Sequence, residues 1–229
     1  MKMPGDVGEA GRNRVTGQRP KAFDQVRMDL AVALIPLMLI PLIMSSSATT
    51  AADDPPSKIL SREAWGAKPA MTERMKRHSP REIVIHMTGV RMQPSVTLQR
   101  KMAGLQSFSQ RAAKIGKRTR APWGDVPYHF YISSDGQMAK GRDVGYAGDT
   151  NTNYDTAGRI QIAVEGDFTT EMPKPQQLNS LRKLVAWLAR LHKVPPSAIT
   201  GHNAHAATSC PGKNLEAYLP MLRQAVGSP

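Results

Sequence analysis

The feature that most restricts how this chain can fold is its single cysteine, Cys210. One thiol cannot form an internal disulfide, so the fold has to be held together by a hydrophobic core. About 175 residues follow the N-terminal leader described below, and a chain of that length can bury one sizeable core. A lone thiol can also be a reactive group, a link to another chain, a metal ligand or a small buried hydrophobe. Cys210 lies in the loop-like sequence TSCPG rather than in an apolar run, which favours a chemical role.

The N-terminal region has the layout of an export signal. Residues 1–27 carry six Lys or Arg against three acidic residues, the uncharged apolar run Leu30–Met44 follows, and small residues come next. This order is typical of a secretory signal, and the apolar run is shorter than the roughly 20 residues that a membrane span needs. We therefore predict a basic leader and signal peptide over residues 1–52, cleaved between Ala48 and Asp53. The protein is expected to act in the periplasm, at the cell wall or outside the cell. A retained membrane anchor is the alternative.

Apolar patterns in the remaining chain predict both strands and helices. The segment EIVIHM, Glu82–Met87, is β-branched and apolar, which is typical of a buried strand. From Ser95 to Ile115 apolar residues recur at steps of three and four, which predicts one amphipathic helix with Ser95 as its N-cap. The segment Tyr128–Lys140 predicts a hairpin that turns at Asp135-Gly136.

The C-terminal half continues this mixture. We predict a loop over residues 145–158, a strand over residues 159–168, and a helix that begins at Pro175 and carries a leucine stripe as far as Leu191. A last helix is predicted after Cys210, kinked or split by Pro220. Strands and helices alternate without a strict βαβ rhythm. The sequence therefore predicts a single α/β domain over residues 59–225, with a mixed central β-sheet flanked by helices, after a linker at residues 53–58.

The charge of the chain points to an anionic environment. The formal net charge is +13, and the densest basic cluster is KIGKRTR, residues 114–120. Basic exported proteins are attracted to nucleic acid, lipid headgroups and cell-wall polymers. The cluster has no interleaved aromatic residues and matches no nucleic-acid motif, so we expect no nucleic-acid partner. We expect contact with a membrane only through an uncleaved N-terminal segment.

Three residues could together bind a metal. His86 ends the predicted buried strand, and His202 and Cys210 are eight residues apart in one loop. Imidazole and thiolate are good zinc ligands, and three protein ligands leave a fourth position for water, which is the arrangement of catalytic zinc sites. The spacing alone leaves His86 equally compatible with a hydrogen-bonded core residue. His205 is a possible fourth ligand, although its spacing gives no strong reason to choose it.

Four segments, taken together and in order, resemble a known enzyme family. They are LSREAWGAKP (60–69), IVIHMT (83–88), WGDVPYHFYISSDGQMAKGRD (123–143) and GHNAHAATSCPG (201–212). In this combination the chain is similar to the zinc-dependent N-acetylmuramoyl-L-alanine amidases of the type-2 family, which includes the peptidoglycan recognition proteins. The resemblance covers residues 59–222 and implies the fold of that family. It also implies hydrolysis of the amide between N-acetylmuramic acid and L-alanine, with peptidoglycan or muropeptides as the partner.

The resemblance also assigns roles to residues. It implies one zinc ion per chain held by His86, His202 and Cys210, with Tyr128 and Thr208 as catalytic residues. Zinc would acidify a water molecule and polarise the amide carbonyl, and the two hydroxyl groups would stabilise the charge that develops on the carbonyl oxygen. We expect a monomer whose cleft is lined by the strand ending at His86, the 145–158 loop and residues 203–208. The candidate substrate-binding residues are Asp149, Thr150, Asn151 and His205.

The chain departs from the family pattern at several positions. Asn203-Ala204 stands where relatives often have Arg-Asp, which leaves the support of the loop in question, and Gly148-Asp149-Thr150 stands where relatives often carry a histidine. Glu165 could serve as a base, but a solvated or salt-bridged carboxylate fits it better. The remaining histidines, His78, His129 and His192, are interpreted as structural, and Trp65 as a packing residue.

Two alternatives to an enzyme remain open on the sequence. Some members of the family recognise muropeptides without cutting them, and these typically lack the cysteine ligand that is present here. A basic protein that binds nucleic acid or membrane would explain the charge but none of the four segments.

Overall fold

The computed structural model describes residues 55–56 and 58–227. The predicted leader, its cleavage site and part of the predicted linker lie outside these residues. Within the described part, no helix is both long and apolar enough to cross a membrane.

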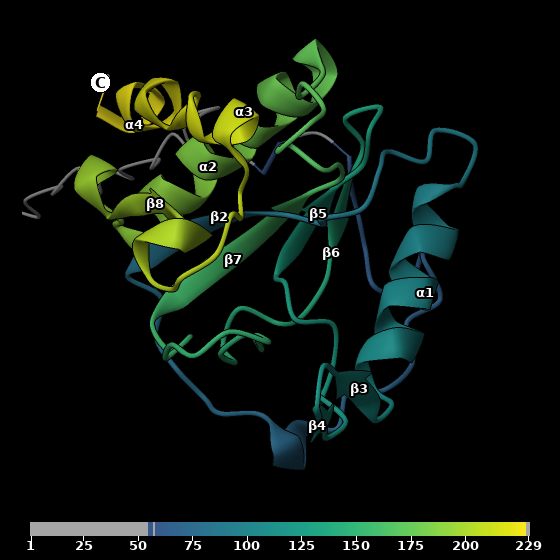
Figure 1. The fold of residues 1–229 in the computed structure, drawn as a ribbon. Helices are drawn as coiled ribbons and strands as arrows, with labels where there is room; N and C mark the ends of the chain where they lie inside the picture. The colour runs from purple at the N-terminus through teal and green to yellow at the C-terminus, as the bar shows by residue number, and fades with distance from the viewer. Residues whose placement is uncertain (1–54, 57, 228–229) are drawn as a thin grey trace, which may run out of the picture. The chain divides into compact units, whose positions relative to one another are not determined.

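A mixed six-stranded sheet forms the centre of the domain (Figure 1). In spatial order its strands are β1 (Ile59–Leu60), β6 (Met138–Lys140), β5 (Phe130–Ile132), β7 (Arg159–Val164), β2 (Glu82–Met87) and β8 (Ile199–Gly201). Strands β5 and β6 pair antiparallel, as the predicted hairpin requires, whereas the other neighbours are parallel. The predicted α/β class with a mixed sheet is confirmed.

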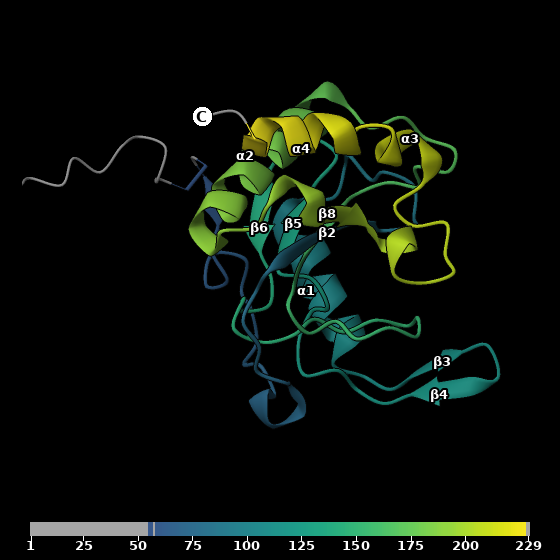
Figure 2. The same ribbon diagram turned by 90° about the vertical axis from the view of Figure 1, so that its left-hand side faces the viewer.

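Helices cover both faces of this sheet. Figure 1 shows α1 on one side and α2 and α4 on the other. The helices are α1 (Leu98–Ser109), α2 (Pro175–His192), α3 (Lys213–Glu216) and α4 (Leu219–Gly227). Short 3-10 helices lie at Thr72–Arg74, Pro196–Ala198 and His202–Ala204. A separate antiparallel hairpin of β3 (Ala113–Ile115) and β4 (Arg118–Arg120) projects from the domain, as Figure 2 shows.

The two faces of the sheet bury different residues because side chains alternate along each strand. On β2, Ile83 and Ile85 point into the large apolar core beneath α2 and α4, and on β7 Ile160 and Ile162 do the same. The intervening residues face α1, where a smaller core includes Trp65, Leu98, Met102 and Tyr131. The indole N–H of Trp65 donates to the carbonyl of Lys140 at 2.7 Å, which confirms that Trp65 packs against the domain.

Helix α1 is shorter than the sequence predicts, and this corrects two expectations. The N-cap is Thr97 and not Ser95, because the Thr97 side chain accepts the backbone N–H of Arg100. The helix ends at Ser109, whereas the apolar spacing predicted it to continue to Ile115. The guanidinium of Arg120 donates to the carbonyls of Phe108, Ser109 and Arg111. These bonds satisfy carbonyls at the end of the helix and so favour a stop there.

The C-terminal helices agree with the sequence apart from their ends. Helix α2 begins at Pro175 as predicted, but Leu191, expected in its buried stripe, is 58% exposed. The predicted last helix is split, with α4 beginning at Leu219 and Pro220 in its first turn, where a missing N–H costs nothing.

Candidate metal centre and cleft

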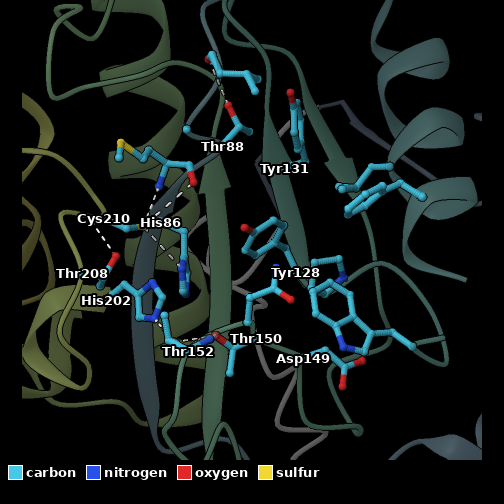
Figure 3. Close-up of a pocket in the computed structure, with 18 of the residues that line it drawn as sticks. His86, Thr88, Tyr128, Tyr131, Asp149, Thr150, Thr152, His202, Thr208 and Cys210 are labelled. Carbon is cyan, nitrogen blue, oxygen red and sulfur yellow. Dashed lines mark hydrogen bonds between the residues drawn. The ribbon is translucent and has the colours of Figure 1, made fainter. Parts of the chain in front are cut away.

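Three side chains converge at the carboxyl ends of two neighbouring strands. His86 lies near the end of β2, and the pairing of Ile85 with Gly201 brings His202, which follows β8, beside it. Cys210 returns to the same point from the following loop. The ligand atoms of His86, His202 and Cys210 all lie within 4.8 Å of one another, and all three residues are buried. The sequence named these three residues, and the fold brings them together (Figure 3).

The geometry of this cluster fits zinc. The sulfur of Cys210 lies 3.7 Å from Nδ1 of His86. Zn–S and Zn–N bonds of usual length at a tetrahedral angle would place two such atoms about 3.5 Å apart. Nδ1 is therefore the His86 nitrogen that faces the sulfur. The buried His, His, Cys donor set suits zinc.

A threonine in the loop at residues 145–158 orients the second histidine. Thr152 Oγ1 lies 2.7 Å from Nε2 of His202, which leaves Nδ1 as the nitrogen able to bind a metal. The ring of Tyr154 packs against that of His202 with centroids 5.1 Å apart. Histidine ligands are commonly fixed through their other nitrogen, so Thr152 has the position of an orienting residue.

The loop that carries His202 and Cys210 is braced without the aspartate that relatives often have. The backbone N–H of Asn203 donates to the carbonyl of Cys210 at 2.8 Å, and its side-chain amide donates to Glu216 at 2.8 Å. Gly201 is required by close packing, because an added Cβ would lie 2.8 Å from Pro211. The chain therefore replaces the missing support with Asn203 and Glu216.

Burial sets the protonation states of the cluster. It lowers the pKa of His86 well below its usual value, and the nearby His202 lowers it further. The pKa of His202 is also lowered by burial. Both imidazoles are therefore neutral at pH 7, as ligands must be. Burial raises the pKa of Cys210 to about 11, although the backbone N–H of Met87, 3.3 Å from the sulfur, opposes the shift. A metal would have to displace the thiol proton on binding.

The cluster lies in a cavity of about 480 Å³ that is large enough for part of an extended substrate. One wall carries Thr208 and the metal cluster, and the 145–158 loop contributes Asp149 through Thr152, as the sequence predicts. Of residues 203–208, only Thr208 lines the cavity. The opposite wall comes from α1 and Trp123, which the sequence did not place there.

Two hydroxyl groups face the metal cluster. The ring of Tyr128 lies 5.2 Å from that of His86, and Figure 3 shows its hydroxyl directed into the cavity on the side of His86. Burial raises the pKa of Tyr128, so its phenol stays protonated at pH 7 and can donate a hydrogen bond. Thr208 Oγ1 accepts the backbone N–H of Cys210 at 3.2 Å, which leaves its own hydrogen able to point at a substrate.

The four residues expected to contact substrate differ in their surroundings. Thr150 and Asn151 line the cavity. Asp149 also lines it, but its carboxylate pairs with the buried guanidinium of Arg142. His205 is outside the cavity lining, and its Nε2 lies 2.9 Å from Thr200 Oγ1. The described structure thus does not bring His205 to the cavity or into the metal cluster.

The other titratable groups named from the sequence serve the fold. Glu165 is buried and accepts from Lys101 Nζ at 2.8 Å and from the backbone N–H groups of Gln93 and Ser134, so it is salt-bridged and not solvated. His129 binds the backbone of Tyr146 and Gln161 through its two nitrogens, which fits the structural role predicted for it. Its ring stacks on that of His78.

Sequence reasoning missed Thr152 and Gln161. Thr152 lies in a loop, where no periodic pattern marks a residue. Gln161 is fully buried on β7, on the face that carries His86 in the neighbouring strand, and its side-chain nitrogen has no hydrogen-bond partner among the described residues. A polar residue inside an otherwise apolar strand was a signal that could have identified it.

Comparisons with known proteins give consistent matches. A sequence model of the Amidase_2 family, described as N-acetylmuramoyl-L-alanine amidase, matches residues 76–213. Peptidoglycan-recognition protein LB of Drosophila melanogaster is 28% identical over 170 residues, which cover 71% of this chain and 68% of that protein. The solved structure of wild-type Drosophila PGRP-LB has a TM-score of 0.59 at 25% identity and covers 71% of this chain and 92% of that chain. The solved structure of the endolysin N-acetylmuramoyl-L-alanine amidase LysCS from Clostridium intestinale has a TM-score of 0.53 at 26% identity, covering 71% and 91%.

Proposed function

The chain belongs to the Amidase_2 family of N-acetylmuramoyl-L-alanine amidases, and from this premise we propose that it is a zinc-dependent hydrolase. Its substrate is peptidoglycan or a muropeptide, and the bond that it cleaves is the amide between N-acetylmuramic acid and L-alanine. The observation that carries this proposal is the convergence of His86, His202 and Cys210 on one wall of a cavity. These three residues would hold zinc, and such a site keeps one position open for water or substrate.

Zinc at this site would supply a Lewis acid and an activated water molecule. The chain supplies the remaining chemistry. Attack on the amide carbonyl places negative charge on its oxygen. A hydrogen-bond donor aimed at that oxygen stabilises the transition state more than the bound substrate, because the charge is larger there. Tyr128 and Thr208 both present hydroxyl groups to the cavity beside the cluster, and we assign them this role. Thr152 holds His202 in position through Nε2.

A non-catalytic peptidoglycan-binding module is the second candidate, because the family includes recognition proteins. A module that only binds has no need of a buried thiolate ligand or of a phenol beside it. The presence of Cys210 and Tyr128 at the cluster therefore favours the enzyme. We also propose that the protein acts outside the cytoplasm, because its leader sequence has the layout of a signal peptide.

Mass spectrometry of the digestion products tests the proposal. Zinc-loaded protein is incubated with purified peptidoglycan and with a single muropeptide, and the same reactions are run with chelator and with Cys210→Ser. Free peptides that begin with L-alanine, absent from both controls, are the expected result. Binding to either substrate without release of such peptides would establish the recognition module instead.

A further inference from the structure

One wall of the cleft comes from a stretch of chain without any acidic residue. Between Glu82 and Asp125 the sequence has no Asp or Glu and eight Lys or Arg, against a net charge of +13 for the whole chain. This stretch contains α1, β3 and β4, and it supplies Lys101, Phe108 and Trp123 to the cavity lining. The stretch that supplies this wall therefore carries eight positive charges and no negative charge.

Two of these eight cationic side chains are buried or nearly buried and form contacts that stabilise the fold. Lys101 is neutralised by Glu165 at 2.8 Å, in a pair whose side chains are both nearly buried. Arg120 is buried, caps the end of α1, and stacks its guanidinium 3.9 Å from the ring centroid of Trp123. Because Trp123 lines the cavity, this contact fixes the base of the β3–β4 hairpin to the rim of the cleft.

Other cations on this hairpin and at its base are exposed and have no acidic partner among the described residues. Arg111, Lys114 and Lys117 are exposed, and none of them forms a salt bridge with any residue in the described ranges. Figure 2 shows the hairpin extending away from the body of the domain on the same side as the 201–212 loop, which forms the opposite wall. A basic arm therefore projects on the same side of the domain as a loop that lines the cavity.

We propose that this arm, defined by Arg111, Lys114 and Lys117, is a second contact surface for the substrate and selects polymeric peptidoglycan over single muropeptides. The inference rests on the proposed function. A cavity of about 480 Å³ holds only the part of the substrate around the scissile bond. Peptidoglycan continues beyond it with neighbouring stem peptides that carry free carboxylates. Three exposed cations that form no salt bridge within the described ranges match that charge, and their attraction acts over about 10 Å at moderate salt.

Kinetics on two substrates test the arm. The triple variant Arg111→Gln/Lys114→Gln/Lys117→Gln is compared with the charge-matched control Arg182→Gln/Lys183→Gln/Lys213→Gln, whose residues are exposed on α2 and α3. At low salt the arm variant is expected to lose about tenfold in kcat/KM on purified polymer and to keep the wild-type rate on a single muropeptide. The control variant should stay within about twofold on both. Wild-type turnover of polymer should fall in 0.5 M salt towards that of the arm variant.

Equal losses on both substrates, or no loss on polymer, would overturn the proposal. The assay is repeated with polymer from which acid has removed phosphate-containing chains. If the arm variant is slower than wild type only on the untreated polymer, the arm binds phosphate groups, and the proposal is also overturned. Cosedimentation of the zinc-loaded protein with insoluble polymer separates this inference from the proposed function. Inactive wild-type protein would contradict the amidase, whereas weaker sedimentation of the arm variant than of the control would still support the arm.

Discussion

The two faces of the central sheet show how one set of strands separates stability from chemistry. The face beneath α2 and α4 buries one large apolar core. The face towards α1 buries three polar side chains: His86 on β2, Gln161 on β7, and Glu165, which directly follows β7. The cavity lies on this face. Buried polar groups are costly unless they are paired, so a face that retains them is expected to serve binding or catalysis. Substitutions on the two faces should therefore have separable effects.

The largest effect is expected from Cys210→Ser on the α1 face. A serine hydroxyl resists the deprotonation that a thiol undergoes on zinc, so metal and activity should be lost together. We expect less than about a thousandth of wild-type turnover, a loss comparable to removal of a central catalytic group. Metal analysis and muropeptide kinetics measure both. Full zinc occupancy in this variant would remove Cys210 from the ligand set.

Tyr128→Phe should separate metal binding from catalysis on the same face. It is expected to keep a full equivalent of zinc and nearly unchanged stability, while turnover falls by roughly 10²- to 10³-fold, the usual cost of one oxyanion donor. Substrate binding should change much less, since the hydrogen bond strengthens only as charge develops. Wild-type turnover would show that Tyr128 is only a packing residue.

Leu184→Ala tests the opposite face. Leu184 on α2 is fully buried in the large core, and its truncation should lower the free energy of unfolding by about 2–5 kcal/mol. The folded fraction at 25 °C should retain its zinc and its specific activity. Denaturant unfolding and active-site titration measure the two quantities. A fall in specific activity of the folded protein would show that the faces are coupled.

Thr152→Val tests a supporting residue that only the structure identified. Loss of the hydroxyl frees Nε2 of His202, and zinc affinity should fall by roughly 10- to 100-fold, the usual cost of removing such a partner. Competition with a chelator measures the affinity. Thr170→Val, at an exposed site away from the cavity, is the matched control, and equal affinity in the two variants would leave Thr152 without a role in metal binding.

The smallest effect concerns His129, a buried polar group outside the cleft. Burial lowers its pKa to about 3, far below the value of an unfolded chain. The unfolded state therefore binds one more proton between these values, and stability should fall as pH drops below about 6.5, by at most 1.4 kcal/mol per pH unit. His129→Gln keeps a donor and an acceptor but does not titrate, so it should flatten the slope between pH 6.5 and 5. An unchanged slope would assign that pH dependence to other groups.

The sequence predicted the parts of the molecule that depend on local pattern. A β-branched apolar run identified β2, alternation identified β7, and the ordered segments identified His86, His202 and Cys210. The β5–β6 hairpin followed from its Asp-Gly turn. These features are encoded in short runs of residues, in which the spacing of apolar residues and the residue types at turns determine the local structure.

The features that the sequence missed depend on contacts between distant segments. Helix α1 stops at Ser109 because Arg120, beyond the helix, caps it, and the spacing of apolar residues carries no information about that contact. Thr152 supports His202 across 50 positions of the chain. Asn203 braces its loop by pairing with Glu216 on α3, while Ala204 stands where an aspartate was expected. Such pairings become visible only when the fold brings the segments together.

The zinc content of three purified proteins tests the division between the two faces most directly. Wild type, Leu184→Ala and Cys210→Ser are loaded with zinc, freed of excess metal under folding conditions, and analysed by elemental mass spectrometry. The account predicts one zinc per chain in wild type and in Leu184→Ala, and a small fraction of that in Cys210→Ser. A wild-type protein that retains no zinc, or a Cys210→Ser protein that retains as much as wild type, would contradict it.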